Sequence, residues 1–98
     1  MQTNISAKQI TLTPAIEEYI HKKTDRIRKH FDKVQGIYVV LAKEANGYHV
    51  EVKTDVERHD DFVANATHDD LYACVDQCVD RAIRQITDHK DRTRNHKH

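Results

Sequence analysis

Apolar residues spaced three, four or seven positions apart follow the dipeptide Thr13-Pro14. This spacing places them on one side of an α-helix. Thr13 suits the N-cap, and Pro14 suits the first helical position, where the missing amide hydrogen costs nothing. The pattern predicts a helix from about Pro14 to about Lys33, ended before Gly36. The apolar stripe of this helix consists of Ile16, Ile20, Ile27, Phe31 and Val34.

Four segments have the composition or the alternation of β-strands. The opening MQTNIS is a short candidate, and GIYVVLAKE is rich in β-branched and aromatic residues. Asn46-Gly47 then gives a strong hairpin signal. In the next segment, GYHVEVKTDV, apolar and polar residues alternate strictly, so one face of the sheet is expected to contact water. The last predicted strand is FVANAT, with Phe62, Ala64 and Ala66 on one side.

A second helix is predicted to begin near Asp69, whose carboxylate can cap it. No large apolar residue follows Ile86, so the last turns are expected to extend beyond the core. We expect this overhang to be helical at least through Lys90 and to fray after Arg94. The apolar stripe consists of Leu71, Val75, Cys78, Val79, Ala82 and Ile86.

The predicted elements follow the order β-α-β-β-β-α. Two amphipathic helices and a sheet with one polar face assemble most simply as an α+β fold, a four-stranded sheet with two helices packed on one face. At 98 residues the chain is expected to form a single domain, residues 1–98, in which residues 90–98 are a basic C-terminal extension of the last helix.

Composition narrows the functional classes. The chain has no apolar run near the ~20 residues of a membrane helix and no secretory signal, so a cytoplasmic location and no membrane partner are expected. Cys74 and Cys78 are four residues apart and are interpreted as small residues on a packed helix in a reducing compartment. No HExxH motif, phosphate-binding glycine loop or nucleophile elbow is present, so we do not expect an enzyme or a cofactor.

The formal charge is zero, with 16 basic and 16 acidic residues, but the charges are unevenly distributed. Residues 20–43 carry a net charge of +5 and residues 81–98 a net charge of +4. Residues 44–80 carry −8, and residues 1–19 carry −1. Because the basic segments coincide with the predicted helices, the folded protein is expected to be electrically two-sided, with the acidic residues facing elsewhere.

The basic residues of each helix fall on the side away from its apolar stripe at 100° per residue. Lys22, Arg26, Lys29 and Lys33 form a narrow stripe on the first helix, with Lys23 near its boundary. On the second helix Arg81, Arg84 and Arg92 line up, and Asp88 interrupts them. Either helix alone could simply present a solvated face, but two together predict paired basic ridges that fit the phosphates of a folded nucleic acid.

The C-terminal TDHKDRTRNHKH admits three interpretations: a metal-binding histidine cluster, a cloning remnant or a basic arm. The histidines alternate with basic residues, unlike a tag, and no cysteine accompanies them, so a basic arm is favoured and no metal is expected. The pairs His59-Asp60-Asp61 and His68-Asp69-Asp70 lie at element ends, where turn and capping roles are common.

Four segments in order, MQTNIS, FDKVQGIYVVL, DDLYACVDQCVDRAIRQI and HKDR, resemble the bacterial ribosome hibernation factors over nearly the whole chain. The likeness is to the short hibernation promoting type, in the family also described as ribosome-associated inhibitors and sigma-54 modulation proteins. Members share the β-α-β-β-β-α fold. The chain ends soon after the second helix, so we expect no C-terminal dimerisation domain of the long members.

The resemblance implies binding to the small ribosomal subunit near the decoding centre, where the protein blocks tRNA and mRNA and so inhibits translation. It also implies inactive ribosome dimers in stationary phase, possible action alongside ribosome modulation factor, and a monomer in isolation. Two alternatives stay open: a protein–protein module that modulates a sigma factor, and a general double-stranded RNA-binding domain.

The family's basic residues correspond here to Lys23, Arg26, Arg81, Arg84, Lys90, Arg92 and Arg94, whereas Asp88 stands where relatives often carry lysine. Helix geometry adds Lys22, Lys29 and Lys33. The predicted RNA-binding residues are therefore Lys22, Lys23, Arg26, Lys29, Lys33, Arg81, Arg84, Lys90, Arg92 and Arg94.

Overall fold

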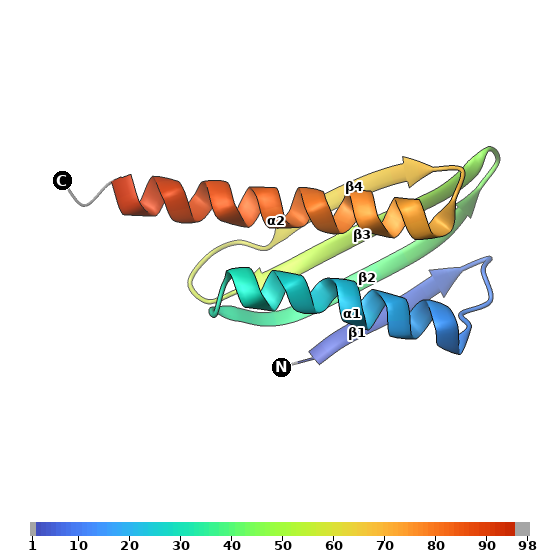
Figure 1. Cartoon of the computed structure of the whole chain (residues 1–98), viewed down its shortest axis with the longest axis horizontal. Coiled ribbons are helices and arrows are strands. Elements are labelled where there is room, and N and C mark those ends of the chain that lie inside the picture. The colour runs from blue at the N-terminus through green and yellow to red at the C-terminus, as the bar shows by residue number, and fades with distance from the viewer. Residues whose placement is uncertain (1, 96–98) are drawn as a thin grey trace.

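The structure is a computed structural model that describes residues 2–95, with the side chains of residues 3–90. Within this part of the chain the elements follow the predicted order β-α-β-β-β-α, which confirms the α+β fold (Figure 1). The elements are β1 (Gln2–Lys8), α1 (Pro14–His30), β2 (Val34–Glu44), β3 (Gly47–Val56), β4 (Phe62–His68) and α2 (Leu71–Asn95).

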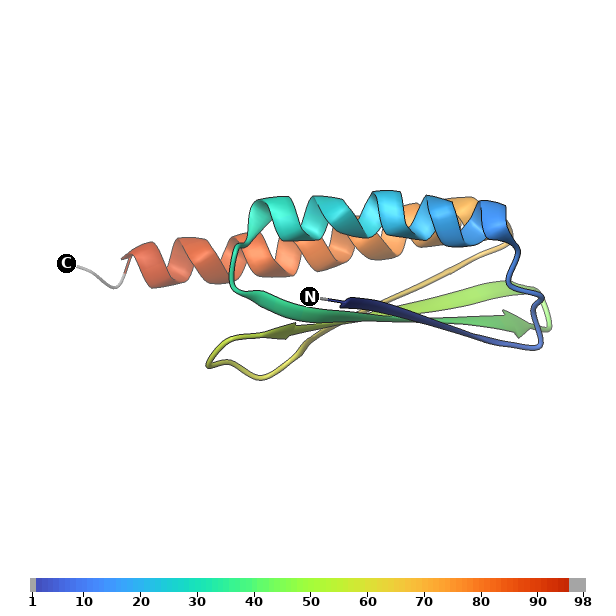
Figure 2. The ribbon, with the colours of Figure 1, turned by 90° about the horizontal axis from the view of Figure 1, so that it is seen from below.

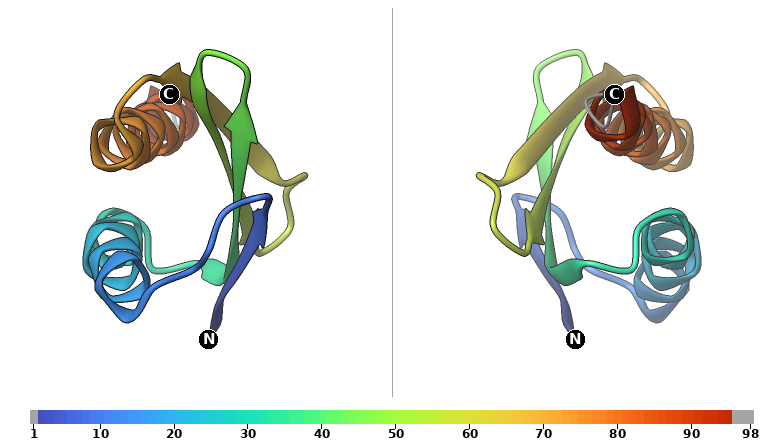
Figure 3. Two further views of the ribbon diagram at one scale, coloured as in Figure 1. Left: turned by 90° about the vertical axis from the view of Figure 1, so that its right-hand side faces the viewer. Right: turned by 90° about the vertical axis from the view of Figure 1, so that its left-hand side faces the viewer.

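The strands form one mixed sheet in the order β1-β2-β3-β4. β1 and β2 are parallel, with α1 as the crossover between them, and the other two pairs are antiparallel. Figures 2 and 3 show both helices side by side on the same face of the sheet, as predicted. Both helices also run in the same direction, so their exposed faces point away from the sheet together (Figures 1 and 3).

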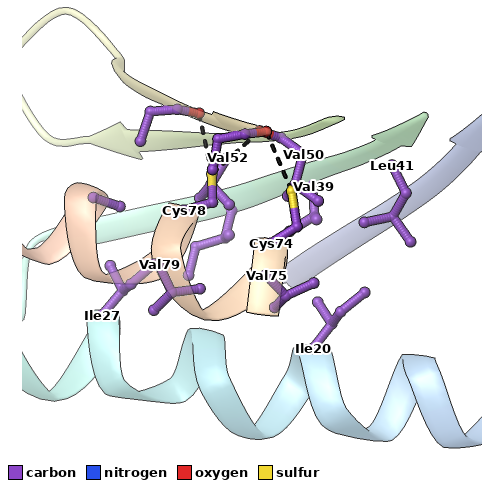
Figure 4. Packing of buried hydrophobic residues seen from close by; sticks show 14 of the residues in the cluster. Ile20, Ile27, Val39, Leu41, Val50, Val52, Cys74, Val75, Cys78 and Val79 are labelled. Atoms are coloured by element: carbon purple, nitrogen blue, oxygen red, sulfur yellow. Dashed lines mark hydrogen bonds between the residues drawn. The ribbon is translucent and has the colours of Figure 1, made fainter. Parts of the chain in front are cut away.

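The core lies between the sheet and the two helices. Alternate residues of β2 and β3, such as Leu41 and Val50, point toward the helices and are fully buried. Ile20 and Ile27 of α1 meet Val79 of α2 over this layer (Figure 4). The opposite residues of β3 form the polar outer face that the alternation predicted. Burial of this continuous apolar layer fixes the helices on the sheet.

Cys74 and Cys78 are free thiols packed against the sheet. Their Sγ atoms donate to the backbone oxygens of Ala66 and Ala64 at 3.2 and 3.3 Å (Figure 4). Burial raises the pKa of the Cys78 thiol to about 12, because the thiolate would lose its hydration. Both cysteines therefore act as small core residues, as the sequence indicated.

The predicted end of α1 was wrong. The helix ends at His30, and Phe31 follows with an extended backbone. Val34 belongs to β2, where it pairs with Val56, and Gly36 is a buried strand residue rather than a residue beyond a helix. The apolar side chain of Val34 fits both a helical stripe and a strand, and pairing with β3 satisfies its backbone as well.

The predicted start of α2 was displaced by one residue. Asp70, not Asp69, caps the helix: its side chain accepts a hydrogen bond from the Tyr72 amide at 3.0 Å. His68 Nδ1 in turn accepts from the Asp70 amide at 2.9 Å, so this His-Asp-Asp segment has the predicted turn and capping role. The predicted Asn46-Gly47 hairpin is confirmed, and Gly47 has a φ of 148° that favours glycine.

Candidate RNA-binding surface

The exposed side of α1 carries basic residues opposite the buried Ile20 and Ile27. Lys22 and Lys29 are both exposed there. Arg28, which the helical wheel did not select, turns toward the sheet and donates to Thr3 Oγ1 at 2.7 Å. The predicted stripe of α1 therefore faces solvent, while the remaining arginine serves packing.

Lys33 does not belong to this stripe. Because α1 ends at His30, Lys33 lies in the turn that leads to β2, where it is exposed. Its predicted position on the helix was wrong, for the same reason that the helix end was wrong.

Polar side chains join α1 to α2 along an interhelical seam, made of Tyr19, Lys23 and Arg26 on α1 with Asp76 and Asp80 on α2. The Tyr19 hydroxyl donates to Asp76 Oδ1 at 2.6 Å, and Lys23 Nζ lies 3.3 Å from the same oxygen. Arg26 pairs with Asp80 at 3.4 Å. The hydrogen bond to Asp76 and burial raise the pKa of Tyr19 to about 12, because phenolate would face a carboxylate.

The seam corrects the expectation that the acidic residues face elsewhere. Asp76 and Asp80 lie on the helical face, where they contact two of the predicted RNA-binding cations, Lys23 and Arg26. The sequence carried a signal for this arrangement: each aspartate follows a buried valine of the apolar stripe, which places it at the helix–helix boundary. Lys23 and Arg26 therefore divide their charge between the seam and solvent.

On α2, two side chains cover the free edge of the sheet. Arg81 donates to the Asn65 backbone oxygen at 2.6 Å, and Gln85 Nε2 donates to the Val63 oxygen at 2.9 Å. These are alternate carbonyls of β4, which is an edge strand. Arg84 lies one turn from Arg81 and is exposed. The helix thus presents Arg84 to solvent and ties Arg81 to the strand.

The end of α2 extends past the sheet, as predicted (Figure 1). It is helical through Lys90, whose Nζ donates to the backbone oxygen of His30 at the C-terminus of α1, at 2.6 Å. A cation is favourable there because the last carbonyls of a helix carry partial negative charge. The backbones of Arg92 and Arg94 continue α2, whereas their side chains, and the expected fraying, fall outside the described residues.

No helix of the described part is long and apolar enough to cross a membrane. Among the same residues, no three histidine, cysteine or acidic side chains gather as metal ligands would. His96 and His98 of the C-terminal segment lie outside that part of the chain, so the metal interpretation of the tail is not addressed by it.

Comparison with known proteins bears directly on this fold. The model of the family "Sigma 54 modulation protein / S30EA ribosomal protein" matches residues 3–94. The chain belongs to this family. The match covers both helices and nearly the whole sheet, and it confirms the resemblance found in the sequence.

Relatives in the S30EA family include curated ribosome hibernation promoting factors. The protein from Azotobacter vinelandii is 35% identical over 92 residues, which cover 94% of this chain and 85% of that protein. The protein from Escherichia coli K12 is 32% identical over 99 residues, covering 98% of this chain and all of the relative. The family resemblance therefore extends to proteins of nearly the same length.

Two solved structures have the same fold. A ribosomal subunit interface protein from Coxiella burnetii superposes with a TM-score of 0.86 at 22% identity, covering 93% of this chain and 99% of that one. The N-terminal domain of Thermus thermophilus Protein Y superposes with a TM-score of 0.78 at 28% identity, covering 88% and 96%.

Proposed function

We propose that the protein binds the small ribosomal subunit through the exposed faces of α1 and α2 that point away from the sheet. The observation that carries this proposal is the placement of Lys22, Lys29 and Arg84 on two helices that run side by side. Helices of 17 and 25 residues are ~26 and ~38 Å long, enough to follow several phosphates of folded RNA. The names of the curated relatives, ribosome hibernation promoting factors, support a ribosomal partner.

The proposed mechanism is steric exclusion. Bound near the decoding centre, the protein would occupy space that tRNA and mRNA require, inhibit translation and favour inactive ribosome dimers in stationary phase, alongside ribosome modulation factor where a cell has one. No covalent step is needed, because a rigid two-layer domain held by phosphate contacts excludes other ligands by volume alone.

Co-sedimentation with separately purified ribosomal subunits tests this proposal. The protein is expected to pellet with small subunits, to be displaced by bound tRNA and mRNA, and to lose affinity steeply with added salt, because each phosphate contact releases counterions. Capture of RNA polymerase subunits without ribosomes, or displacement by any duplex RNA, would favour one of the two rival functions instead.

Neutralising Asp80 is expected to strengthen RNA binding. Asp80→Asn removes one negative charge from the seam and frees Arg26, so affinity for the small subunit should rise about three- to tenfold at 0.1 M salt. Stability should change little, because an exposed ion pair contributes less than about 1 kcal/mol. Asp55→Asn on the outer face of the sheet is the matched control, and equal gains in both variants would contradict a local effect.

We propose further that residues 1–98 form one ribosome-binding unit in which residues 90–98 act as a basic arm. A chain that stops after Lys90 loses Arg92, Arg94 and Lys97 against a single acid, Asp91. Its ribosome affinity should fall about tenfold in the same co-sedimentation assay. Its thermal unfolding should stay close to that of the full chain, because the buried stripe ends at Ile86. Loss of folding in this truncated chain would show that the core extends further.

A further inference from the structure

Aromatic rings gather where α2 leaves the sheet. His59, from the loop after β3, stacks on Phe62 with ring centroids 4.6 Å apart and an angle of 8° between the planes. His89 of α2 meets these rings edge-on, 4.4 Å from His59 and 5.4 Å from Phe62. This cluster lies outside the basic faces described above, and none of its members was predicted to bind RNA.

The cluster forms the wall of an open hollow of about 290 Å³, completed by Gln85 and Asp88. Gln85 gives its amide hydrogen to the Val63 oxygen, so its Oε1 faces away from the strand, buried and without a hydrogen-bond partner. Asp88 contributes an exposed carboxylate. Both groups are acceptors, so the hollow suits a flat ring that carries N–H donors on its edge.

A second hollow of about 300 Å³ adjoins the first and shares Gln85 and Asp88 with it. Its walls include Arg81 and Arg84, which are cations that suit a phosphate. An aromatic hollow with acceptors beside a cationic one matches the two halves of a nucleotide. Asp88 would repel phosphate, so its place among the basic residues of α2 fits a contact with a base.

We propose that these two hollows bind one unstacked nucleotide of the RNA, with guanine as the base. Guanine places N1–H and its 2-amino group on one edge, and these two donors match Asp88 and Gln85. The ring contacts the His59–Phe62 pair, as single-stranded bases contact aromatic side chains in RNA-binding proteins. The phosphate contacts Arg84. This inference rests on the proposed RNA-binding function and adds a base preference to it.

Titration of the full chain with guanosine, inosine and uridine 5′-monophosphates, followed by NMR, tests the site. Guanosine monophosphate should shift the His59 ring and Gln85 side-chain amide signals, and should bind about tenfold more tightly than the inosine nucleotide, which lacks the 2-amino group. Asp88→Asn should remove most of this preference, whereas Asp25→Asn, an equal charge change on α1, should leave it intact. His59→Ala should weaken the binding of guanosine monophosphate severalfold.

Equal binding of the three nucleotides, no shifts at His59 and Gln85, or equal effects of the two aspartate variants would each overturn the site. Ribosome co-sedimentation of the same samples separates the two proposals. Ribosome binding without guanine preference defeats this site alone, whereas guanine preference without ribosome binding defeats the proposed function and leaves the nucleotide site standing.

Discussion

Replacing Lys29 and Arg84 together by glutamate is expected to lower affinity for the small ribosomal subunit by about a hundredfold or more at physiological salt. Each reversal removes a phosphate contact and puts a negative charge in its place. Both side chains are exposed on the helices, so the fold should tolerate the change. Arg26 is left intact because a glutamate there would face Asp80 and disturb the seam. Sedimentation across a salt series measures both affinity and slope, and the slope should fall by about two.

The matched control reverses Lys8 and Lys53, which gives the same net charge. Both are exposed on the strands, and Lys53 belongs to the polar outer face. If binding depends on the helical faces, this control should retain most of its affinity. Equal losses in the two double variants would mean that net charge alone, and not the surface, controls binding.

Replacing Ile27 by alanine is expected to destabilise the protein by about 3 kcal/mol. Ile27 is fully buried between α1, α2 and the sheet, so the truncation removes apolar contacts on three sides (Figure 4). For a domain of this size, such a loss lowers the melting temperature by more than about 10 °C. Urea unfolding measures the change directly, and the midpoint should move without a change in slope.

Lys29→Ala, half a turn further along the same helix, is the control for Ile27→Ala. It keeps helix propensity and removes an exposed side chain, so stability should change by less than about 0.5 kcal/mol. A small effect of Ile27→Ala would show that α1 is held mainly by its seam with α2 and not by the core.

The hydrophobic pattern predicted every element of the described chain and their order, because each buried face repeats at its own period. Strict alternation in residues 47–56 left no helical interpretation. The end of α1 was missed since Phe31 and Val34 are apolar at helical spacing as well. Only the pairing of Val34 with Val56, a contact 22 residues away in sequence, decides between helix and strand.

The candidate site was less predictable than the fold. Charge counting located the cations on the helices, yet it assigned Asp76 and Asp80 to an acidic middle segment, because a linear count ignores which residues face each other. The nucleotide-binding hollows left no sequence signal. His59 and His89 are 30 positions apart, and only the docking of the loop after β3 against α2 brings their rings together.

The cover over β4 links two properties that usually evolve separately. An uncovered edge strand invites copies of a protein to pair edge to edge and aggregate. Here the guanidinium of Arg81 occupies the carbonyl of Asn65, which such pairing would use. If the same arginine turns to RNA when the protein binds, the ribosome itself must then shield the edge. Selection for tighter binding at Arg81 is thus restrained by solubility in growing cells, where unbound copies have no ribosome to protect them.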